Sequence, residues 1–198
     1  GCPDLVQLSL DVTQVEELDV TKNPKLSILN ISETKIRSID LSKNPKLTQF
    51  FATRGATAYD DYKLTEIDLT HNPELSYLFL GYNAITEIDL SKNTKLFDLS
   101  VPNNRLTDID LSNNTNLYNV NIRKNYFGFA TLPADPGSWN DYFYEQNASP
   151  LNRSYKTGTV IDFSDKMMRE GTETLATLYH VNEDDLSLPI PADPKSYS

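Results

Sequence analysis

The sequence has one cysteine, Cys2, and two histidines, His71 and His180. A single cysteine excludes an internal disulfide framework and any cysteine-rich zinc site, so the core alone must hold the fold. The sequence also lacks a G-x-S-x-G elbow, a phosphate-binding glycine loop and zinc-ligand spacing. We therefore expect a protein that is not an enzyme and that uses no metal or organic cofactor.

Positive charge and long apolar runs are scarce as well. The 198 residues include 18 lysines and arginines against 28 aspartates and glutamates, for a net charge of −10. Because nucleic-acid binding draws on a clustered positive surface, we expect no nucleic-acid partner. No apolar run reaches the roughly 18 residues that cross a bilayer, so no transmembrane segment is predicted in this chain.

What the sequence does contain is a repeated block of seven residues that opens with leucine or isoleucine followed by aspartate. The block begins at Leu18, Ile39, Ile67, Ile88 and Ile109. These starts are 21, 28, 21 and 21 residues apart. Such fixed-period self-similarity is typical of a solenoid, and the 28-residue unit indicates one repeat with an insertion.

The other half of each unit follows the pattern L-x-x-L-x-L-x-x-N-x-L. One copy consists of Leu75, Leu78, Leu80, Asn83 and Ile85. The alternation at L-x-L predicts a short strand, and the asparagine predicts a turn in which its side-chain amide bonds nearby backbone. Stacked copies therefore predict a parallel sheet with an asparagine ladder.

With these repeats, residues 2–132 resemble the leucine-rich repeat proteins, most closely the bacterial secreted or surface type with units of about 21 residues, similar to internalins. The resemblance implies an α/β-type solenoid of about six repeats, with mostly short parallel β strands and an irregular or 3-10 convex side. It also implies an extracellular or bacterial cell-surface location. Fold analogy alone does not choose among adhesion, recognition and signalling.

We expect three segments along the chain. Residues 1–132 form the leucine-rich repeat solenoid with its insertion at 53–63, residues 133–157 form an aromatic C-terminal cap and linker, and residues 158–198 form a small β appendage. Within the appendage, 160–163 and 175–179 are predicted strands, followed by a proline-rich exit. The appendage is either the start of a truncated immunoglobulin-like domain or an extended cap on the solenoid.

Cys2 has two interpretations. Cys2-Pro3 aligns with Asn23-Pro24 at the 21-residue offset, which places Cys2 at an asparagine position inside a repeat. The alternative is that Cys2 is the acylated residue of a lipoprotein cleavage site, which would give the chain a lipid anchor.

The repeated aspartates predict a column of like charges along one side of the solenoid. These residues are Asp19, Asp40, Asp68, Asp89 and Asp110. We expect each carboxylate to accept hydrogen bonds from backbone or lysine, a structural role, and not to form a metal track.

Candidate binding residues come from the strand pattern. The leucines point into the core, so the residues between them project from the concave face of the sheet. Solvent-facing aromatic rings with a polar rim suit a protein or glycan partner, whereas the alternative is that cross-strand ring pairs only stabilise the sheet. The candidates, on the concave face and in the insertion, are Phe51, Tyr59, Tyr62, Tyr77, Phe79, Tyr82, Asp98, Asn121 and Arg123.

Three functions remain open from the sequence. The first is a non-catalytic surface or secreted module that binds a protein through its concave face and insertion. The second is a structural spacer arm within a longer surface protein. The third is a glycan-binding module, because exposed tyrosines and phenylalanines can stack on sugar rings.

Overall fold

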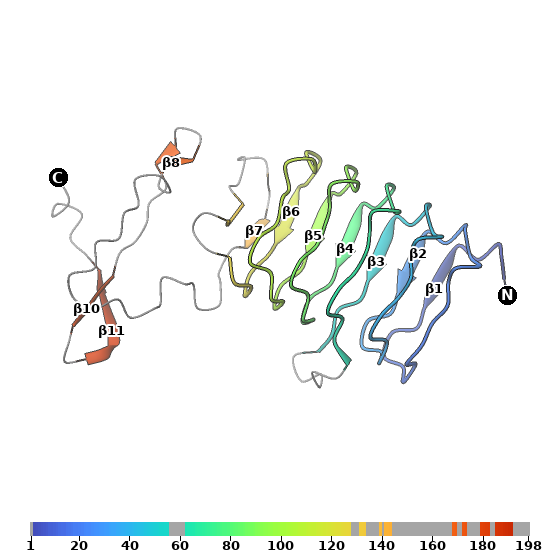
Figure 1. Cartoon of the computed structure of the whole chain (residues 1–198), viewed down its shortest axis with the longest axis horizontal. Coiled ribbons are helices and arrows are strands. Elements are labelled where there is room, and N and C mark those ends of the chain that lie inside the picture. The colour runs from blue at the N-terminus through green and yellow to red at the C-terminus, as the bar shows by residue number, and fades with distance from the viewer. Residues whose placement is uncertain are drawn as a thin grey trace. The chain divides into compact units, whose positions relative to one another are not determined.

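The computed structural model describes residues 2–55, 62–127, 131–133 and 139, together with the backbone of the later strands (Figure 1). The chain divides into two compact units, Gly1–Ser154 and Tyr155–Ser198. Among the described residues, no helix has the length and apolar character needed to span a membrane.

The first unit is built on a seven-stranded sheet whose strands pair in parallel and in sequence order. Equivalent residues of successive repeats face each other, as Gln7 faces Ile28 and Ile28 faces Gln49. The predicted parallel-strand solenoid is therefore confirmed. The strands are β1 (Gln7–Ser9), β2 (Ile28–Asn30), β3 (Gln49–Phe51), β4 (Tyr77–Phe79), β5 (Asp98–Ser100), β6 (Asn119–Asn121) and β7 (Asp141–Phe143).

The core lies between the sheet and the returning turns. The middle residue of each strand from β2 to β6 is fully buried, while its two neighbours remain partly exposed. This is the alternation that the L-x-L pattern predicts, because successive side chains of a strand point to opposite faces. Away from the sheet, the described residues form turns and extended segments with little helix.

Two asparagine ladders tie neighbouring repeats together. In the strand-end ladder (Asn83, Asn104 and Asn125), Asn104 Nδ2 donates to Leu80 O of the preceding repeat at 2.8 Å, and Asn104 Oδ1 accepts from Ile85 N at 3.1 Å. Such bonds satisfy buried backbone groups that the sheet itself leaves unpaired. This is the ladder that the sequence predicts.

The second ladder, the turn ladder (Asn44, Asn72, Asn93 and Asn114), was not predicted and lies in the asparagine-proline or asparagine-threonine turns. Asn44 Nδ2 donates to Asn23 O at 2.9 Å and to Val20 O at 3.0 Å, and the other three repeat this pattern. In the preceding repeat, Asn23 Nδ2 donates in the same way to Cys2 O at 2.7 Å. Cys2 thus occupies an asparagine position of the repeat, as its register predicts.

The repeated aspartates have the structural role that we expected. Each Oδ1 atom accepts the backbone N–H of the residue two positions later at 2.9 Å, which closes a turn at the surface. Hydrogen bonds from the hydroxyl and the backbone N–H of that threonine or serine hold the pKa values of all five carboxyls below the usual 3.8, helped at Asp19, Asp40 and Asp89 by a nearby lysine. The neighbouring aspartate opposes this effect at Asp40 and Asp89.

This arrangement predicts a loss of stability in acid. Because the folded-state pKa values are lowered, the carboxylates stabilise the fold above about pH 4, and that contribution disappears as the pH falls through the folded-state values. We expect the urea midpoint of unfolding to drop between about pH 6 and about pH 2. An Asp40→Asn, Asp89→Asn variant should lose less over this range, and an equal loss in both proteins would contradict the assignment.

Beyond the repeats, β7 extends the sheet next to β6, and Trp139 packs half-buried against the core. In the second unit, β8 (Met168–Arg169) pairs with β9 (Thr172–Glu173), and β10 (Tyr179–Asn182) pairs with β11 (Asp185–Pro191), both antiparallel. The strand expected at 160–163 lies outside the described residues. Of 175–179, only Tyr179 is described, and it begins β10.

Part of the expected proline-rich exit is a strand. Residues 185–191 form β11, which includes Pro189 and Pro191. Proline is compatible with a strand whose N–H side faces no partner, as at the edge of a two-stranded sheet.

Candidate functional site

Five aromatic residues gather on the solvent-facing side of the sheet. The rings of Phe51 and Phe79 stack with centroids 5.2 Å apart. A second group begins at Tyr77, whose ring is 6.1 Å from that of Phe97, and Phe97 in turn stacks on Tyr118 at 5.3 Å. Tyr77 and Phe79 flank the same buried residue of β4, so they join the two groups on one face. We call these five residues the aromatic patch.

The second group is unusually exposed for large rings. Tyr77, Phe97 and Tyr118 are 36%, 40% and 43% exposed. Soluble proteins scatter single apolar residues over their surfaces, but neighbouring exposed rings mark an interaction surface or a groove. Phe51 and Phe79 are half-buried beside them.

The same face carries little charge. In β2 to β6, the outward-facing residues are Ile28, Asn30, Gln49, Phe51, Tyr77, Phe79, Asp98, Ser100, Asn119 and Asn121. Asp98 is the one charged residue among these ten, although charged residues make up 23% of the chain. Depletion of charge together with enrichment of aromatic rings is the composition of a protein-interface core.

At the edge of the sheet, the insertion is attached by a buried arginine. Arg54 is only 1% exposed, and it follows β3 in a repeat that has Gly55 at the strand-end asparagine position. Its Nη1 donates to Ile31 O at 2.8 Å, the carbonyl that corresponds to the one bonded by ladder asparagines elsewhere. Nη2 donates to Ile36 O at 2.7 Å, and Nε donates to Tyr62 O at 3.1 Å. Arg54 thus replaces the asparagine in the strand-end ladder.

The positive charge of buried Arg54 is offset by one acidic neighbour, Glu33. Burial lowers the pKa of the Arg54 guanidinium, and the nearby Glu33 carboxylate raises it. On the outer side, Lys35 and Arg37 each hold their charged groups 5.2 Å from the centre of the Tyr62 ring. The described end of the insertion is therefore fixed through both the backbone and the ring of Tyr62.

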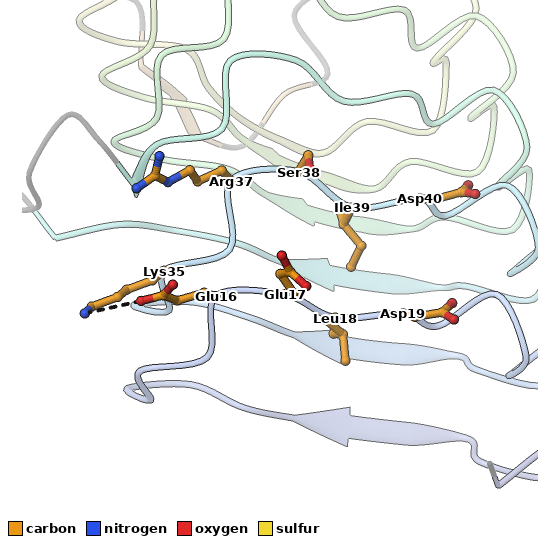
Figure 2. Close-up of a pocket in the computed structure, with 9 residues that line it drawn as sticks. All are labelled: Glu16, Glu17, Leu18, Asp19, Lys35, Arg37, Ser38, Ile39 and Asp40. Atoms are coloured by element: carbon orange, nitrogen blue, oxygen red, sulfur yellow. Dashed lines mark ion pairs between the residues drawn. The ribbon is translucent and has the colours of Figure 1, made fainter.

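A shallow groove crosses the opposite side of the first repeats (Figure 2). Its walls come from two successive repeats, with Glu16, Glu17 and Asp19 on one and Lys35, Arg37 and Asp40 on the next. Lys35 Nζ lies 3.7 Å from Glu16 Oε1. Acidic and basic groups are mixed here, and no cluster of three metal-ligating side chains occurs within the described part of the chain. The groove offers no chemistry beyond these surface ion pairs.

Among solved structures, the functional domain of InlJ from Listeria monocytogenes, described as including a cysteine ladder, matches with a TM-score of 0.62 and 28% identity. The match covers 83% of this chain and 33% of that one. The chain has the leucine-rich repeat solenoid fold. An internalin, InlF, from the same organism matches at a TM-score of 0.60 and 24% identity, over 66% of this chain and 38% of the other.

A leucine-rich repeat protein of Leptospira interrogans shares the fold at a TM-score of 0.56 and 20% identity, over 64% of this chain and 33% of the other. This chain therefore spans about a third of the length of each of these three solved structures. No protein-family model and no curated protein sequence matches it.

The structure brings some of the predicted residues of this leucine-rich repeat chain together. Phe51, Tyr77, Phe79, Asp98 and Asn121 share the outward side of the sheet. Arg123 is exposed just beyond β6.

Other predicted residues lie elsewhere. Tyr82 is half-buried in the turn after β4 with a left-handed φ of 61°, a turn position and not a strand position. Tyr62 lies under Lys35 and Arg37 at the base of the insertion. Tyr59 lies outside the described residues.

Sequence reasoning missed Phe97, Tyr118 and Arg54. Phe97 and Tyr118 each lie one residue before a strand, where the L-x-L alternation does not predict an orientation. The available signal was their 21-residue spacing, since it places equivalent residues side by side on neighbouring repeats. For Arg54, the signal was the missing asparagine in its own repeat.

Proposed function

We propose that this leucine-rich repeat chain is a non-catalytic bacterial surface or secreted module that binds a protein partner through the aromatic patch. The observation that carries the proposal is the grouping of five rings on a face with one charged residue among the ten outward positions of β2 to β6. The fold supports an interaction role, because leucine-rich repeats present an extended, fixed surface. The likeness to internalin structures supports the bacterial surface or secreted setting.

Energetically, the patch has the properties of a binding hot spot. Tyrosine and phenylalanine bury large areas with few rotatable bonds, so little side-chain entropy is lost on binding. Ring contacts between neighbouring repeats hold the side chains in place before a partner arrives. The proposed surface extends to Asn121 and Arg123 at one end and to Tyr82, Tyr62 and Tyr59 near the insertion.

The test is a binding screen of the purified chain against a panel of extracellular proteins and a glycan array. We expect a protein hit that a Tyr77→Ser, Phe79→Ser variant weakens by about 100-fold or more, since central aromatic residues each contribute about 2 kcal/mol or more. The matched control is Tyr126→Ser, because Tyr126 is 43% exposed but follows the turn after β6 and lies outside the strands.

Two outcomes would contradict the proposal. Equal loss of binding in Tyr126→Ser would show that the effect does not come from the patch. If the double variant instead unfolds at much lower urea concentration than the native chain, the rings stabilise the sheet through cross-strand pairs, as in the alternative interpretation.

A spacer arm is the second candidate function. It is favoured by the turn ladder, which fixes each repeat to the one before it along the described repeats. The same screen separates the two functions, because a spacer gives no hit with either protein. A hit on the glycan array alone would favour a glycan-binding module instead.

A further inference from the structure

The single charge in the outward positions of β2 to β6 lies among the exposed rings. Asp98 follows Phe97 in the chain and faces Tyr77 of β4 across the sheet. On its other side, Asp98 faces Asn119 of β6, which follows Tyr118. Since neighbouring strands are about 4.8 Å apart, the half-buried Asp98 lies next to Tyr77 across the sheet and next to the stacked pair of Phe97 and Tyr118 along the chain. We call the five residues Tyr77, Phe97, Asp98, Tyr118 and Asn119 the Asp98 corner.

The carboxylate is held in one orientation with one oxygen still available. Asn119 Nδ2 donates to Asp98 Oδ2 at 2.9 Å. No other hydrogen bond of the Asp98 carboxylate occurs among the described residues, which leaves its Oδ1 atom available. An ionised carboxylate accepts several hydrogen bonds through its two oxygens, so Asp98 can accept a further donor from a ligand.

Negative charge beside aromatic faces selects for a particular ligand group. A cation near the ring faces is attracted by their electron density, and the nearby carboxylate adds a charge-assisted hydrogen bond. Among protein side chains, the planar guanidinium stacks on rings and offers five N–H donors, whereas the lysine ammonium is a compact and strongly hydrated charge. The net charge of −10 on the chain also favours approach of a cationic group.

We propose that the Asp98 corner binds an arginine side chain of the partner protein, with the guanidinium stacked on the rings and hydrogen-bonded to Asp98. This inference rests on the proposed function, and it names the chemical group that the aromatic patch recognises. The remaining rings of the patch, Phe51 and Phe79, contact the apolar side chains that surround this arginine.

The experiment titrates the intact chain with the peptide acetyl-Gly-Arg-Gly-amide and follows the aromatic proton resonances by NMR. Two further peptides replace arginine by lysine or by citrulline, which keeps the shape of arginine but has no charge. We expect the arginine peptide to shift the resonances of Tyr77, Phe97 and Tyr118, with the lysine peptide binding at least about threefold more weakly and the citrulline peptide about tenfold.

Variants of the chain locate the effect. Asp98→Asn should weaken binding of the arginine peptide by about fivefold or more, because it removes the charge but keeps the shape. Asp11→Asn is the matched control, since Asp11 is an exposed acid just past β1, away from the rings, and should change the affinity less than twofold.

Several results would overturn the inference. These are equal shifts by the citrulline and arginine peptides, equal binding of the lysine peptide, or unchanged affinity in Asp98→Asn. Ring shifts caused by a neutral oligosaccharide in place of the arginine peptide would do the same, and would favour a sugar ligand. The peptide comparison uses the native chain, so it stands even if Asp98→Asn folds poorly.

Failure of the inference can be distinguished from failure of the proposed function. If a captured partner protein is lost in Tyr77→Ser, Phe79→Ser but retained in Asp98→Asn, the aromatic patch binds a protein without recognising arginine at the Asp98 corner. If the native chain captures no protein at all, the proposed function fails, and the peptide titration still reports on the Asp98 corner.

Discussion

Replacing Arg54 by alanine is expected to lower the free energy of unfolding by about 3 to 5 kcal/mol, the largest effect of any single substitution outside the apolar core. The guanidinium donates to the carbonyls of Ile31, Ile36 and Tyr62. Without it, the carbonyls of Ile36 and Tyr62 lose this donor, Ile31 O keeps only the Thr34 hydroxyl, and a large cavity is left. Urea unfolding followed by circular dichroism measures the change through the midpoint.

The control for this prediction is Arg105→Ala, because Arg105 is exposed and should change stability by no more than about 0.5 kcal/mol. Arg54→Lys should fall between the two, since an ammonium group can reach fewer of the three carbonyls. Similar midpoints for Arg54→Ala and Arg105→Ala would show that the guanidinium does not hold the insertion in place.

The second large effect is expected at Asn104 in the strand-end ladder. Asn104→Ala removes two inter-repeat bonds, to Leu80 O and from Ile85 N, and one bond to Val101 O within the repeat. All of these groups are buried, so we expect a loss of about 2 to 4 kcal/mol in the free energy of unfolding. The same urea measurement applies.

A graded variant tests the reason for this loss. In the second repeat the chain itself has Thr34 at the ladder position, where the hydroxyl donates to Ile31 O within the repeat at 2.7 Å. Asn104→Thr should therefore keep the bond within its repeat, lose those between repeats, and cost roughly half as much as alanine. Asn113→Ala, at an exposed position, is the control. Equal stability of the alanine and threonine variants would show that the bond within the repeat contributes little, and a threonine variant as stable as the native chain would show the same for the inter-repeat bonds.

Much of the fold follows from the sequence because each repeat has the same pattern of apolar residues. The alternation around Leu29, Leu78 and Leu99 predicts both the strand and its buried face, and the structure has both. The period itself predicts which residues become neighbours, as with Tyr77 and Asp98. Repetition removes the usual difficulty of pairing strands that are distant in the sequence.

The site was less predictable because it depends on where repeats differ. Phe97 and Tyr118 lie outside the strands, so their ring stacking follows from how two side chains pack and not from the repeat pattern. Tyr82 was predicted to lie one step past the strand, and its left-handed backbone belongs to the turn that follows β4. For Arg54, an insertion suggested a surface loop, whereas the missing ladder donor required a long side chain to turn inward.

Arg54 also has a consequence for how this protein can change over evolutionary time. Its guanidinium bonds to the preceding repeat and to the backbone of Tyr62, so both ends of the intervening segment are attached at fixed points. The entropy of closing a loop rises only slowly with its length. Segments of other lengths and sequences can therefore be exchanged between these two points while the repeats on either side keep their spacing. A single buried side chain therefore makes this repeat tolerant of replacement of its inserted segment.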